Sequence, residues 1–307
     1  MKKIRVGTRT SALAVRQTEL VMEKMKSRNQ EVSFELISQK TKGDRLLDVP
    51  LTEFGGKGAF TTEFEEAILT GRMDIAVHSA KDMPMELAEG LDIWMVLERE
   101  DARDVLISRR GEEPATGLAE GKKKIIGTGS PRRRIQIEGL MNAECSLLRG
   151  NVPTRIEKLR QGRYDGIILA AAGLRRLGLD QEEDLCYRYL SFDEMIPAGG
   201  QGIIAVEGRG EDERRSLFKK CSDHNAELEL ETERYILKRL GATCHEPIGV
   251  FAKIERSGSG QMGSNQETIT IHLLLERDGK PCRGSVTGSA KERLKLAERL
   301  LKEVAKI

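Results

Sequence analysis

Two segments of this chain recur later in the chain with similar residues and in the same order. The segment "RVGTRTSALAVRQTEL", which begins at Arg5, aligns with "IIGTGSPRRRIQIEGL", which begins at Ile125. Further along, "GRMDIAVHSA" from Gly71 aligns with "GRYDGIILAA" from Gly162. The first pair reads as a strand, a tight turn and a helix, and the second as an apolar strand. The repeat predicts two similar lobes, whether they arose by duplication or by convergence.

Strand and helix patterns alternate through both copies, which predicts an α/β fold with helices on the faces of a largely parallel sheet. In the first copy we expect strands at 3–8, 32–38 and 74–80 and helices at 11–26 and 61–69. In the second copy we expect strands at 104–108, 124–130, 145–150 and 165–171 and helices at 132–140 and 152–162. The segment "AGGQGIIAVEGR", residues 198–209, reads as a strand that returns to complete the first lobe, so its crossing forms a hinge.

The remaining residues predict a smaller α+β domain. Its expected elements are a helix at 225–240, strands near 247–254, 268–277 and 284–290 with a turn at Asp278-Gly279, and a final helix at 291–307. The predicted domains are therefore 1–99 with 198–219, 104–195, and 222–307, with hinges near 99–103 and 195–200.

Composition excludes several classes of protein. The net charge is only +2 and aromatic residues make up 4% of the chain, so neither a basic field nor a set of stacking platforms favours binding to nucleic acid. The N-terminus lacks the apolar run of a signal peptide, and no transmembrane run follows it. Five widely spaced cysteines without a CxxC pair fit reduced thiols in the cytoplasm. The four histidines lack metal-ligand spacing, so we expect no structural metal site.

Arginines gather at the predicted loops beyond the carboxyl ends of the strands, where open α/β sheets bind their ligands. They are Arg9, Arg132, Arg133, Arg134, Arg149, Arg155, Arg175 and Arg176. A guanidinium group matches a carboxylate or a phosphate in bidentate fashion, so the group favours a pocket for a ligand with many anionic groups. Ordinary surface charge is the alternative for any one of them.

The motif "HSAKDMP" places Asp82 at the end of an apolar strand. A carboxylate near many cations stays ionised at neutral pH, and it could stabilise a developing cation or transfer a proton. The alternative is a helix cap or an ion pair with Lys81.

Two further segments stand apart. Residues 41–60 are rich in glycine and weakly periodic, which favours a lid near the cleft; their GGKG lacks the spacing of a phosphate-binding P-loop. Cys244 lies in a polar loop beside His245, where a thiolate could be exposed. A lone cysteine is more often a small buried hydrophobic residue, and both readings stay open at this point.

Ten motifs in one order carry a resemblance that covers nearly the whole chain. They are "GTRTSALAVRQ", "TKGD", "GGKGAF", "DIAVHSAKDMP", "ERED.RDVLIS", "GTGSPRR", "LLRGNVPTR", "DGIILAAAGLRRLGL", "PAGGQG" and "CHEPIG". Together they resemble the hydroxymethylbilane synthase family, also called porphobilinogen deaminase. The resemblance implies an enzyme that joins four porphobilinogen molecules head to tail on a covalent primer, releases ammonia each time, and then hydrolyses off the linear tetrapyrrole hydroxymethylbilane.

The same resemblance implies two periplasmic-binding-protein-like (type II) lobes with a central cleft, a third domain and a monomeric enzyme. The primer is a dipyrromethane cofactor, and Cys244 matches the cysteine that holds it by a thioether. Asp82 matches the residue that hydrogen-bonds the pyrrole N–H groups and stabilises the cationic azafulvene formed as ammonia leaves. Arg9, Arg132, Arg133, Arg149, Arg155 and Arg176 match the residues that bind acetate and propionate groups. Ser11, Gln17, Ser79, Lys81, Thr128, Ser130 and Gln201 match polar positions that line the same cleft.

Departures from the family pattern occur at Ala242-Thr243, where Gly-Gly is usual, and at Gly129, Pro131 and Pro153. They bear on loop geometry more than on activity, because glycine reaches backbone angles that threonine adopts only at a cost. Two other functions remain as alternatives. A solute-binding protein of the same fold would need no anchored thiol, and a nucleotide-dependent enzyme would need a complete GxGxxG or GxxxxGK[ST] motif, which the chain lacks.

Overall fold

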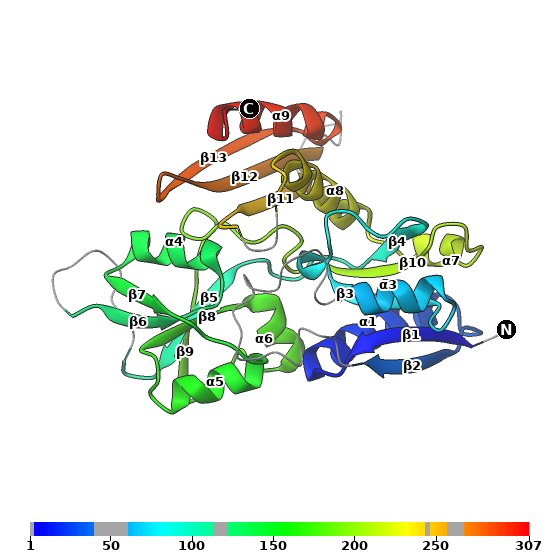
Figure 1. Ribbon diagram of the computed structural model, residues 1–307, viewed down its shortest axis with the longest axis horizontal. Coiled ribbons are helices and arrows are strands. Elements are labelled where there is room, and N and C mark those ends of the chain that lie inside the picture. Colours follow the sequence, from blue (N-terminus) through cyan, green and yellow to red (C-terminus); the bar gives the residue numbers. More distant parts are fainter. Residues whose placement is uncertain (1–2, 40–60, 113–121, 243–245, 257–266, 307) are drawn as a thin grey trace, which may run out of the picture.

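The computed structural model describes residues 3–39, 61–112, 122–242, 246–256 and 267–306. Three parts are visible in Figure 1: one lobe in blue, cyan and yellow-green, a second lobe in green, and a third part in ochre to red that lies against both. Three separate sheets, with five, five and three strands, form the centres of these parts.

The first sheet has the strand order β2-β1-β3-β10-β4. Its strands are β1 (Ile4–Arg9), β2 (Phe34–Gln39), β3 (Ile75–Ser79), β4 (Leu91–Val96) and β10 (Ile204–Arg209), and its helices are α1 (Ala12–Arg28), α3 (Thr62–Leu69) and α7 (Arg215–Lys219). Strand β1 runs parallel to β2 and β3, whereas β10 is antiparallel to both β3 and β4. Strand β10 lies within the predicted return segment, and it pairs with β3 and β4 of the first sheet.

The second sheet repeats this arrangement, with the order β7-β6-β8-β5-β9. Its strands are β5 (Asp104–Arg109), β6 (Lys124–Gly127), β7 (Ala143–Ser146), β8 (Gly166–Ala170) and β9 (Leu185–Tyr189), and its helices are α4 (Pro131–Leu140), α5 (Val152–Arg160) and α6 (Ala171–Leu177). Strand β5 is the antiparallel member here, as β10 is in the first sheet.

The repeated sequence motifs occupy equivalent places in the two sheets. Asp74 accepts a hydrogen bond from the backbone N–H of Arg5 at 2.8 Å, and Asp165 accepts one from the N–H of Ile125 at 2.7 Å. Each aspartate directly precedes one strand, β3 or β8. It binds a backbone N–H near the start of the parallel neighbour of that strand, β1 or β6. The aligned "GRMD" and "GRYD" segments make the same contact in both lobes.

Helices cover both faces of each of these two sheets. In β3, Ile75 and Val77 belong to the core cluster that contains α1 residues, whereas Ala76 packs with Phe64 of α3. Strands buried on both faces read as continuous apolar runs, as "DIAVHSA" does.

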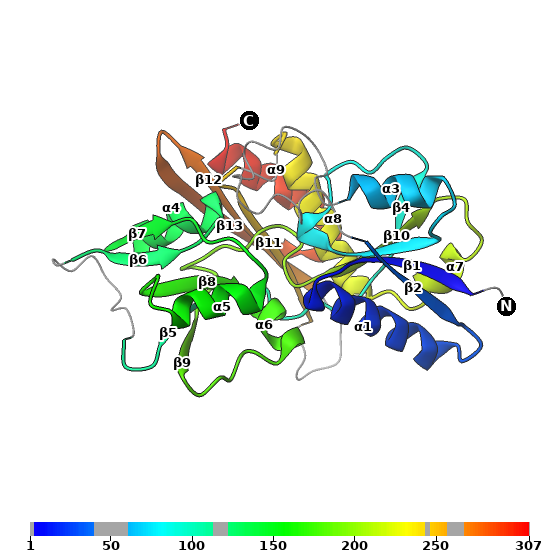
Figure 2. The same cartoon turned by 60° about the horizontal axis from the view of Figure 1, so that its bottom comes forward.

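The third part is a three-stranded antiparallel sheet with two helices on one face (Figures 1 and 2). Its elements are α8 (His224–Arg239), β11 (Gly249–Arg256), β12 (Glu267–Arg277), β13 (Lys280–Ser289), the 3₁₀ turn η3 (Ala290–Glu292) and α9 (Arg293–Val304). Asp278 and Gly279 have φ values of 52° and 73°, as a type I′ hairpin turn between β12 and β13 requires. On the other face, Phe251 stacks on Phe192, which follows β9, with ring centroids 4.0 Å apart.

A buried ion-pair network joins all three parts where the chain crosses between lobes. Arg99 lies on the first segment that crosses between the lobes, from β4 to β5, and its side chain is 4% exposed. Its Nη1 is 2.7 Å from Glu233 Oε1 of α8. Its Nε donates to the carbonyl oxygen of Gln201 on the second crossing at 2.9 Å, and its Nη1 donates to that of Ala252 in β11 at 2.9 Å. Glu233 Oε2 in turn accepts from the N–H of Gly200 at 2.6 Å.

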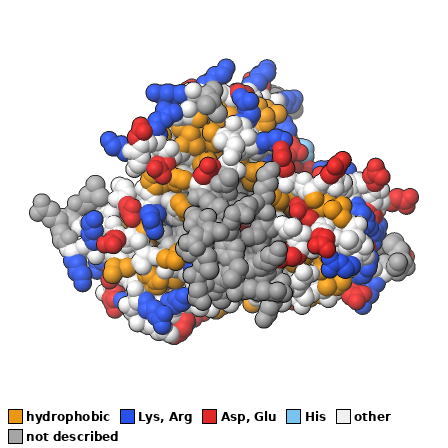
Figure 3. Space-filling view, viewed as in Figure 1, with side chains coloured by type: hydrophobic (Ala, Val, Ile, Leu, Met, Phe, Trp, Pro, Cys, Tyr) orange, Lys and Arg blue, Asp and Glu red, His pale blue; other side chains and the backbone are white. Residues whose placement is uncertain are grey.

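These observations confirm the predicted fold class, an α/β protein with two lobes and a smaller α+β C-terminal part. Figure 3 shows acidic and basic side chains interspersed over the described surface of one face, in keeping with the net charge of +2.

Candidate functional site

A small pocket of about 70 Å³ in the first lobe gathers several of the predicted site residues. It lies where the carboxyl ends of β1 and β3 meet the N-terminal half of α1. Its lining residues are Arg9, Ser11, Leu13, Ala14, Gln17, Thr61, Val77, His78, Ser79 and Asp82. Five predicted residues, Arg9, Ser11, Gln17, Ser79 and Asp82, are therefore brought together from two stretches of the chain, 9–17 and 79–82.

Hydrogen bonds fix the polar walls of this pocket. The Ser11 hydroxyl caps α1 by accepting from the N–H of Ala14 at 3.3 Å. Gln17 is buried, and its side-chain amide donates to the Ser79 hydroxyl at 2.8 Å, which joins α1 to the end of β3. A 3₁₀ turn, η2 (Ala80–Asp82), follows at once and leaves Asp82 exposed. The pocket thus has a preorganised polar wall with a carboxylate at its edge.

Lys81 connects this turn to the chain that returns from the second lobe. Its Nζ donates to Gln201 Oε1 at 3.4 Å. Burial lowers the pKa of Lys81 to about 8, with repulsion from Arg133 and Arg132 adding to the effect and attraction from Asp82 and Asp104 opposing it. Lys81 is thus a cation held among other cations.

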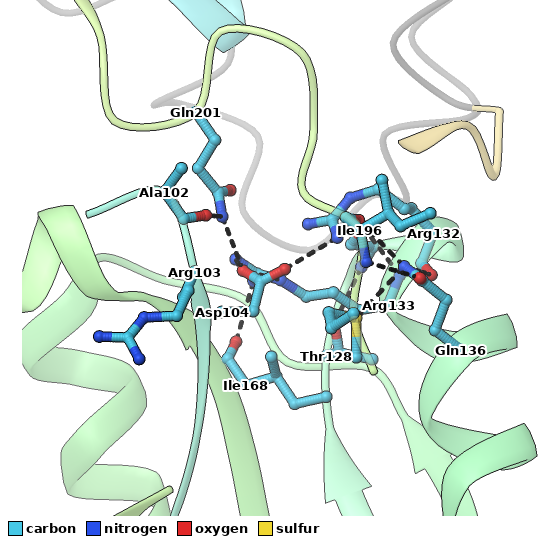
Figure 4. Close-up of polar contacts among 12 residues, drawn as sticks. Ala102, Arg103, Asp104, Thr128, Arg132, Arg133, Gln136, Ile168, Ile196 and Gln201 are labelled. Carbon is cyan, nitrogen blue, oxygen red and sulfur yellow. Dashed lines mark hydrogen bonds and ion pairs between the residues drawn. The ribbon is translucent and has the colours of Figure 1, made fainter. Parts of the chain in front are cut away.

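Asp104, at the start of β5, is the centre of a fully buried polar cluster (Figure 4). Its Oδ1 accepts from Arg133 Nη2 at 2.7 Å and from Gln201 Nε2 at 3.0 Å, and its Oδ2 lies 2.8 Å from Arg132 Nη1. Burial alone would raise the pKa of Asp104, but the charges of the two arginines outweigh burial and hold it well below its usual range. The carboxylate stays ionised and fixes both guanidinium groups.

The same arginines also bind backbone carbonyl oxygens. Arg132 Nη1 donates to Ile196 at 2.7 Å and Arg133 Nη1 donates to Ile168 at 2.9 Å. Both arginines are less than a tenth exposed. In this conformation their hydrogen bonds go to the protein, so they contribute a fixed positive charge behind the site.

Arg149 and Arg155 lie at the N-terminal end of α5 in the second lobe. Arg155 Nε donates to the carbonyl oxygen of Gly150 at 2.7 Å. Burial lowers the pKa of Arg155 to about 10, repulsion from Arg133 and Arg149 adds to this, and Asp82 of the first lobe opposes it. The charge of Asp82 therefore acts on Arg155 across the two lobes.

Arg176, at the end of α6, reaches the second crossing between the lobes. Its Nη2 donates to the carbonyl oxygen of Gly202 at 2.5 Å, and burial lowers its pKa to about 10. Arg134 and Arg175, which the sequence analysis grouped with these cations, are exposed, and Arg175 pairs with Glu100 and Asp101.

Thr128 and Ser130 shape the turn before α4. The N–H of Ser130 is bound by the Thr128 hydroxyl at 3.1 Å, and the Ser130 hydroxyl caps α4 by accepting from the N–H of Arg133 at 3.5 Å. The two hydroxyl groups therefore hold the backbone from which Arg132 and Arg133 project.

Two acidic residues of this region were missed by the sequence analysis. Asp104 belongs to a quoted motif, but periodicity gives no sign that a residue at the start of a strand binds arginines 28 and 29 positions later. Glu207 of β10 is fully buried and lies 2.8 Å from His78 Nε2, beside the pocket. A charged residue inside an apolar run, as in "IIAVEGR", is the signal that could have identified it.

Cys244 and the predicted lid at 41–60 lie outside the described residues, as does Thr243. The residues that flank Cys244 are placed: α8 ends at Arg239, the N–H of Ala242 donates to the carbonyl oxygen of Leu237 at 3.0 Å, and β11 begins at Gly249. Among the described residues, no group of three or more histidine, cysteine, aspartate and glutamate side chains is arranged to hold a metal ion.

Comparisons with known proteins agree with the resemblance. A family described as porphobilinogen deaminase, dipyromethane cofactor binding domain, matches residues 4–216. A porphobilinogen deaminase of Streptococcus sanguinis is 40% identical over 307 residues, which is 99% of this chain and 96% of the relative. One of Exiguobacterium sibiricum is 43% identical over 284 residues, which is 91% of this chain and 90% of the relative.

Solved structures with similar folds are more distant. The periplasmic aliphatic sulphonate binding protein SsuA of Escherichia coli has a TM-score of 0.42 at 12% identity, covering 78% of this chain and 71% of SsuA. The periplasmic VFT2 domain of Bordetella pertussis BvgS has a TM-score of 0.41 at 13% identity, covering 71% of this chain and 86% of the domain.

Proposed function

Because this chain belongs to the porphobilinogen deaminase family, we propose that it is a hydroxymethylbilane synthase. Its reaction joins four porphobilinogen molecules head to tail, with loss of one ammonia at each addition. Hydrolysis then releases the linear tetrapyrrole hydroxymethylbilane. The enzyme is a transferase of tetrapyrrole and haem biosynthesis.

One observation in the structure carries this proposal: the exposed carboxylate of Asp82 interacts with partly buried cations of both lobes. Asp82 attracts Lys81 of its own turn and Arg155 of the second lobe. A porphobilinogen ring carries acetate and propionate groups and a basic amine, so its binding site needs several cations around one anion. The region around Asp82 has this composition.

The residues present suit a dipyrromethane cofactor, whose carboxylates require positive charge. Burial and neighbouring cations lower the pKa of Lys81 to about 8 and of Arg155 to about 10. Such values mean that the positive charges are incompletely compensated, and an anionic group would relieve their repulsion. When bound, the cofactor supplies the pyrrole carbon onto which the first substrate is added. Cys244 would hold it by a thioether.

The chain's own residues perform binding and charge stabilisation. Each addition breaks the substrate bond to its amino group, so positive charge develops on the substrate ring as ammonia leaves. The Asp82 carboxylate accepts hydrogen bonds from pyrrole N–H groups and stabilises that charge electrostatically. Arg9, Arg149, Arg155 and Arg176 bind acetate and propionate groups, and Arg132 and Arg133, fixed by Asp104, add positive potential behind them. Gln17 and Ser79 position the pocket wall, while Ser11, Thr128 and Ser130 hold the turns and Gln201 holds Lys81.

We also propose that the domains are 1–99 with 198–219, 104–195, and 222–307. The membership of β10 in the first sheet and the separate sheet of β11 to β13 support these limits. A monomer in the cytoplasm is part of the same proposal. None of the helices in the described ranges is both long and apolar enough to cross a membrane.

Intact mass spectrometry tests the function directly. We expect the purified chain to be heavier than its sequence by two linked pyrrole units, and we expect Cys244→Ser to lack this excess. Cys282→Ser is the matched control and should keep both the excess and the turnover of porphobilinogen. An active preparation without added mass, or an adduct on Cys282, would contradict the assignment.

The second test concerns Asp82. Asp82→Asn should fold and carry the adduct, because the side chain is exposed, but turnover of porphobilinogen should fall by at least about a hundredfold. Undiminished turnover would remove Asp82 from the mechanism.

A further inference from the structure

Helix α8, whose last residue lies five positions before Cys244, also holds the chain just after Asp82. Arg234 projects from α8, and its Nη2 donates to the carbonyl oxygens of Pro84 at 2.8 Å and Met85 at 2.7 Å. These two carbonyl groups follow Asp82 almost directly in the chain. A side chain of the third domain therefore binds the segment that follows the Asp82 turn.

Other contacts bring the same two segments together. Met85 packs against the core cluster of the third domain. The exposed pair Lys238 and Glu86 approaches to 3.0 Å between Nζ and Oε1. An exposed pair of this kind contributes little, so Met85 and Arg234 provide the specific attachment.

A second contact supports the turn from its other side. Glu233, the residue before Arg234, accepts the N–H of Gly200 at 2.6 Å. A Cβ added at Gly200 would lie 2.9 Å from the carbonyl carbon of Ala80 and from the nitrogen of Lys81, so Gly200 abuts the turn itself. Successive residues of α8 thus bind Gly200, which abuts the turn that carries Asp82, and the chain that follows this turn.

The surroundings of Arg234 suit an arginine in particular. Burial lowers its pKa, and the buried carboxylate of Glu207 opposes that effect. Glu207 pairs with His78 of β3, three positions before Lys81 and four before Asp82. The guanidinium group therefore donates to two carbonyl groups through one nitrogen, Nη2, and is attracted by a buried anion of the first sheet.

We propose that Arg234 is a positioning residue: it sets the place of the Asp82 carboxylate relative to the third domain, which carries the cofactor cysteine. This inference rests on the proposed function. The cofactor cysteine would fix where the growing chain starts, and Asp82 must meet each reacting ring within hydrogen-bond distance. Helix α8 belongs to the domain that carries the cofactor cysteine and also binds the chain after Asp82. Its contacts therefore limit the movement of Asp82 relative to that domain.

The test is the substitution Arg234→Met, which keeps an unbranched side chain and removes the donors. We expect the cofactor mass to remain, KM for porphobilinogen to change by less than about threefold, and kcat to fall by about tenfold to a hundredfold, since a displacement of about 1 Å at a reacting centre has effects of this size. Lys238→Met, which removes the exposed contact between the same segments, is the control and should keep the kcat of the unaltered enzyme. A loaded, folded Arg234→Met enzyme with unchanged kcat would overturn the proposal.

A double-mutant cycle distinguishes a role of Arg234 in positioning Asp82 from a general loss of activity. Asp82→Glu moves the carboxylate by one methylene group, and the loss of kcat in Asp82→Glu/Arg234→Met should be smaller than the product of the two single losses. Losses that multiply independently would show that Arg234 does not act through Asp82.

The conservative variant Arg234→Lys covers the case in which the methionine variant does not fold. Lysine keeps the charge without the planar fork, so we expect its kcat to lie below that of the unaltered enzyme with the adduct intact. An unchanged kcat in Arg234→Lys would overturn the proposal. An unaltered enzyme with neither adduct nor turnover would instead overturn the proposed function, and this result is visible before any Arg234 variant is made.

Discussion

At the scale of single residues, Lys81 shows how a binding site opposes the stability of the fold. Its pKa is lowered to about 8, mainly by burial and further by Arg133 and Arg132. The pKa in the folded protein thus lies below that of an unfolded lysine, about 10.4. The unfolded chain binds more protons between these values, so the protonated lysine costs stability below pH 8, and that cost disappears as the pH rises toward 10.

Lys81→Met should therefore stabilise the free protein while impairing its function. We expect the free energy of unfolding at pH 7 to rise by about 1–2 kcal/mol, and the gain to shrink between pH 8 and pH 10. Urea unfolding at several pH values measures this change, and a KM assay should show weaker substrate binding. Lys295→Met, at a side chain 82% exposed, should change stability by less than about 0.5 kcal/mol at each pH. A loss of stability in Lys81→Met at pH 7 would contradict the argument.

Asp104 shows which part of the site could not be predicted from the sequence. The types of the cleft residues could be predicted, because arginines at strand ends indicate an anion site whatever their partners are. The pairing could not, because Asp104 meets Gln201 from 97 positions away and neither periodicity nor propensity records such a contact. The resemblance predicts Arg132 and Arg133 as residues that bind acetate and propionate groups, and the structure adds that Arg132 Nη1 and Arg133 Nη2 contact Asp104.

At the scale of elements, most segments with a clear apolar or amphipathic pattern were predicted well. Strands β1, β3 and β8 and helices α1, α4 and α8 follow their patterns to within a few residues. The sequence analysis placed no strand at β4 or β9 and no helix at α6. Helix α6 has only seven residues and includes Gly173, so its first residue was read as the end of the preceding strand.

The Asp82 turn offers a prediction about an element. Gly200 has φ +76°, and a Cβ there would meet the backbone of Ala80 and Lys81 at 2.9 Å. Gly200→Ala should therefore lower the free energy of unfolding by about 2–4 kcal/mol, from backbone strain and from displacement of the turn, and should lower kcat.

Gly71→Ala is the matched control for this change, since Gly71 has φ +71° but no atom within 4 Å of an added Cβ. It should show the backbone strain alone, about 1–2 kcal/mol, with unchanged kcat. Thermal unfolding and steady-state kinetics of the two variants separate strain from contact. Equal effects in both would show that Gly200 has no special relation to the turn.

At the scale of the whole molecule, Arg99 and Glu233 tie the crossing segments to the third part. Burial acts to lower the pKa of Arg99, but Glu233 and Glu229 outweigh burial and keep the guanidinium group charged. Removing one member of a buried ion pair leaves the other unpaired, at a cost of about 3–5 kcal/mol. We therefore expect Glu233→Gln to uncouple the third part from the lobes.

Trp94 reports on this uncoupling because it is the only tryptophan and lies fully buried in the first lobe. In the unaltered protein, unfolding followed by Trp94 fluorescence and by circular dichroism should coincide. In Glu233→Gln the dichroism transition should begin at a lower urea concentration than the fluorescence transition. Glu231→Gln, at an exposed residue that pairs with Arg293, is the control and should keep the two transitions together. Coincident transitions in Glu233→Gln would exclude a coupling role for this network.

The position of β10 between β3 and β4 has a consequence for biosynthesis on the ribosome. Strand β4 pairs only with β10, which lies more than a hundred residues further along the chain. A nascent chain that has emerged through β9 can already close the second sheet, whose strands are contiguous from β5, while β4 still lacks a partner and β3 exposes an open edge. The lobe that is translated second is thus the first to be finished, and the lobe translated first waits for residue 209 to leave the exit tunnel.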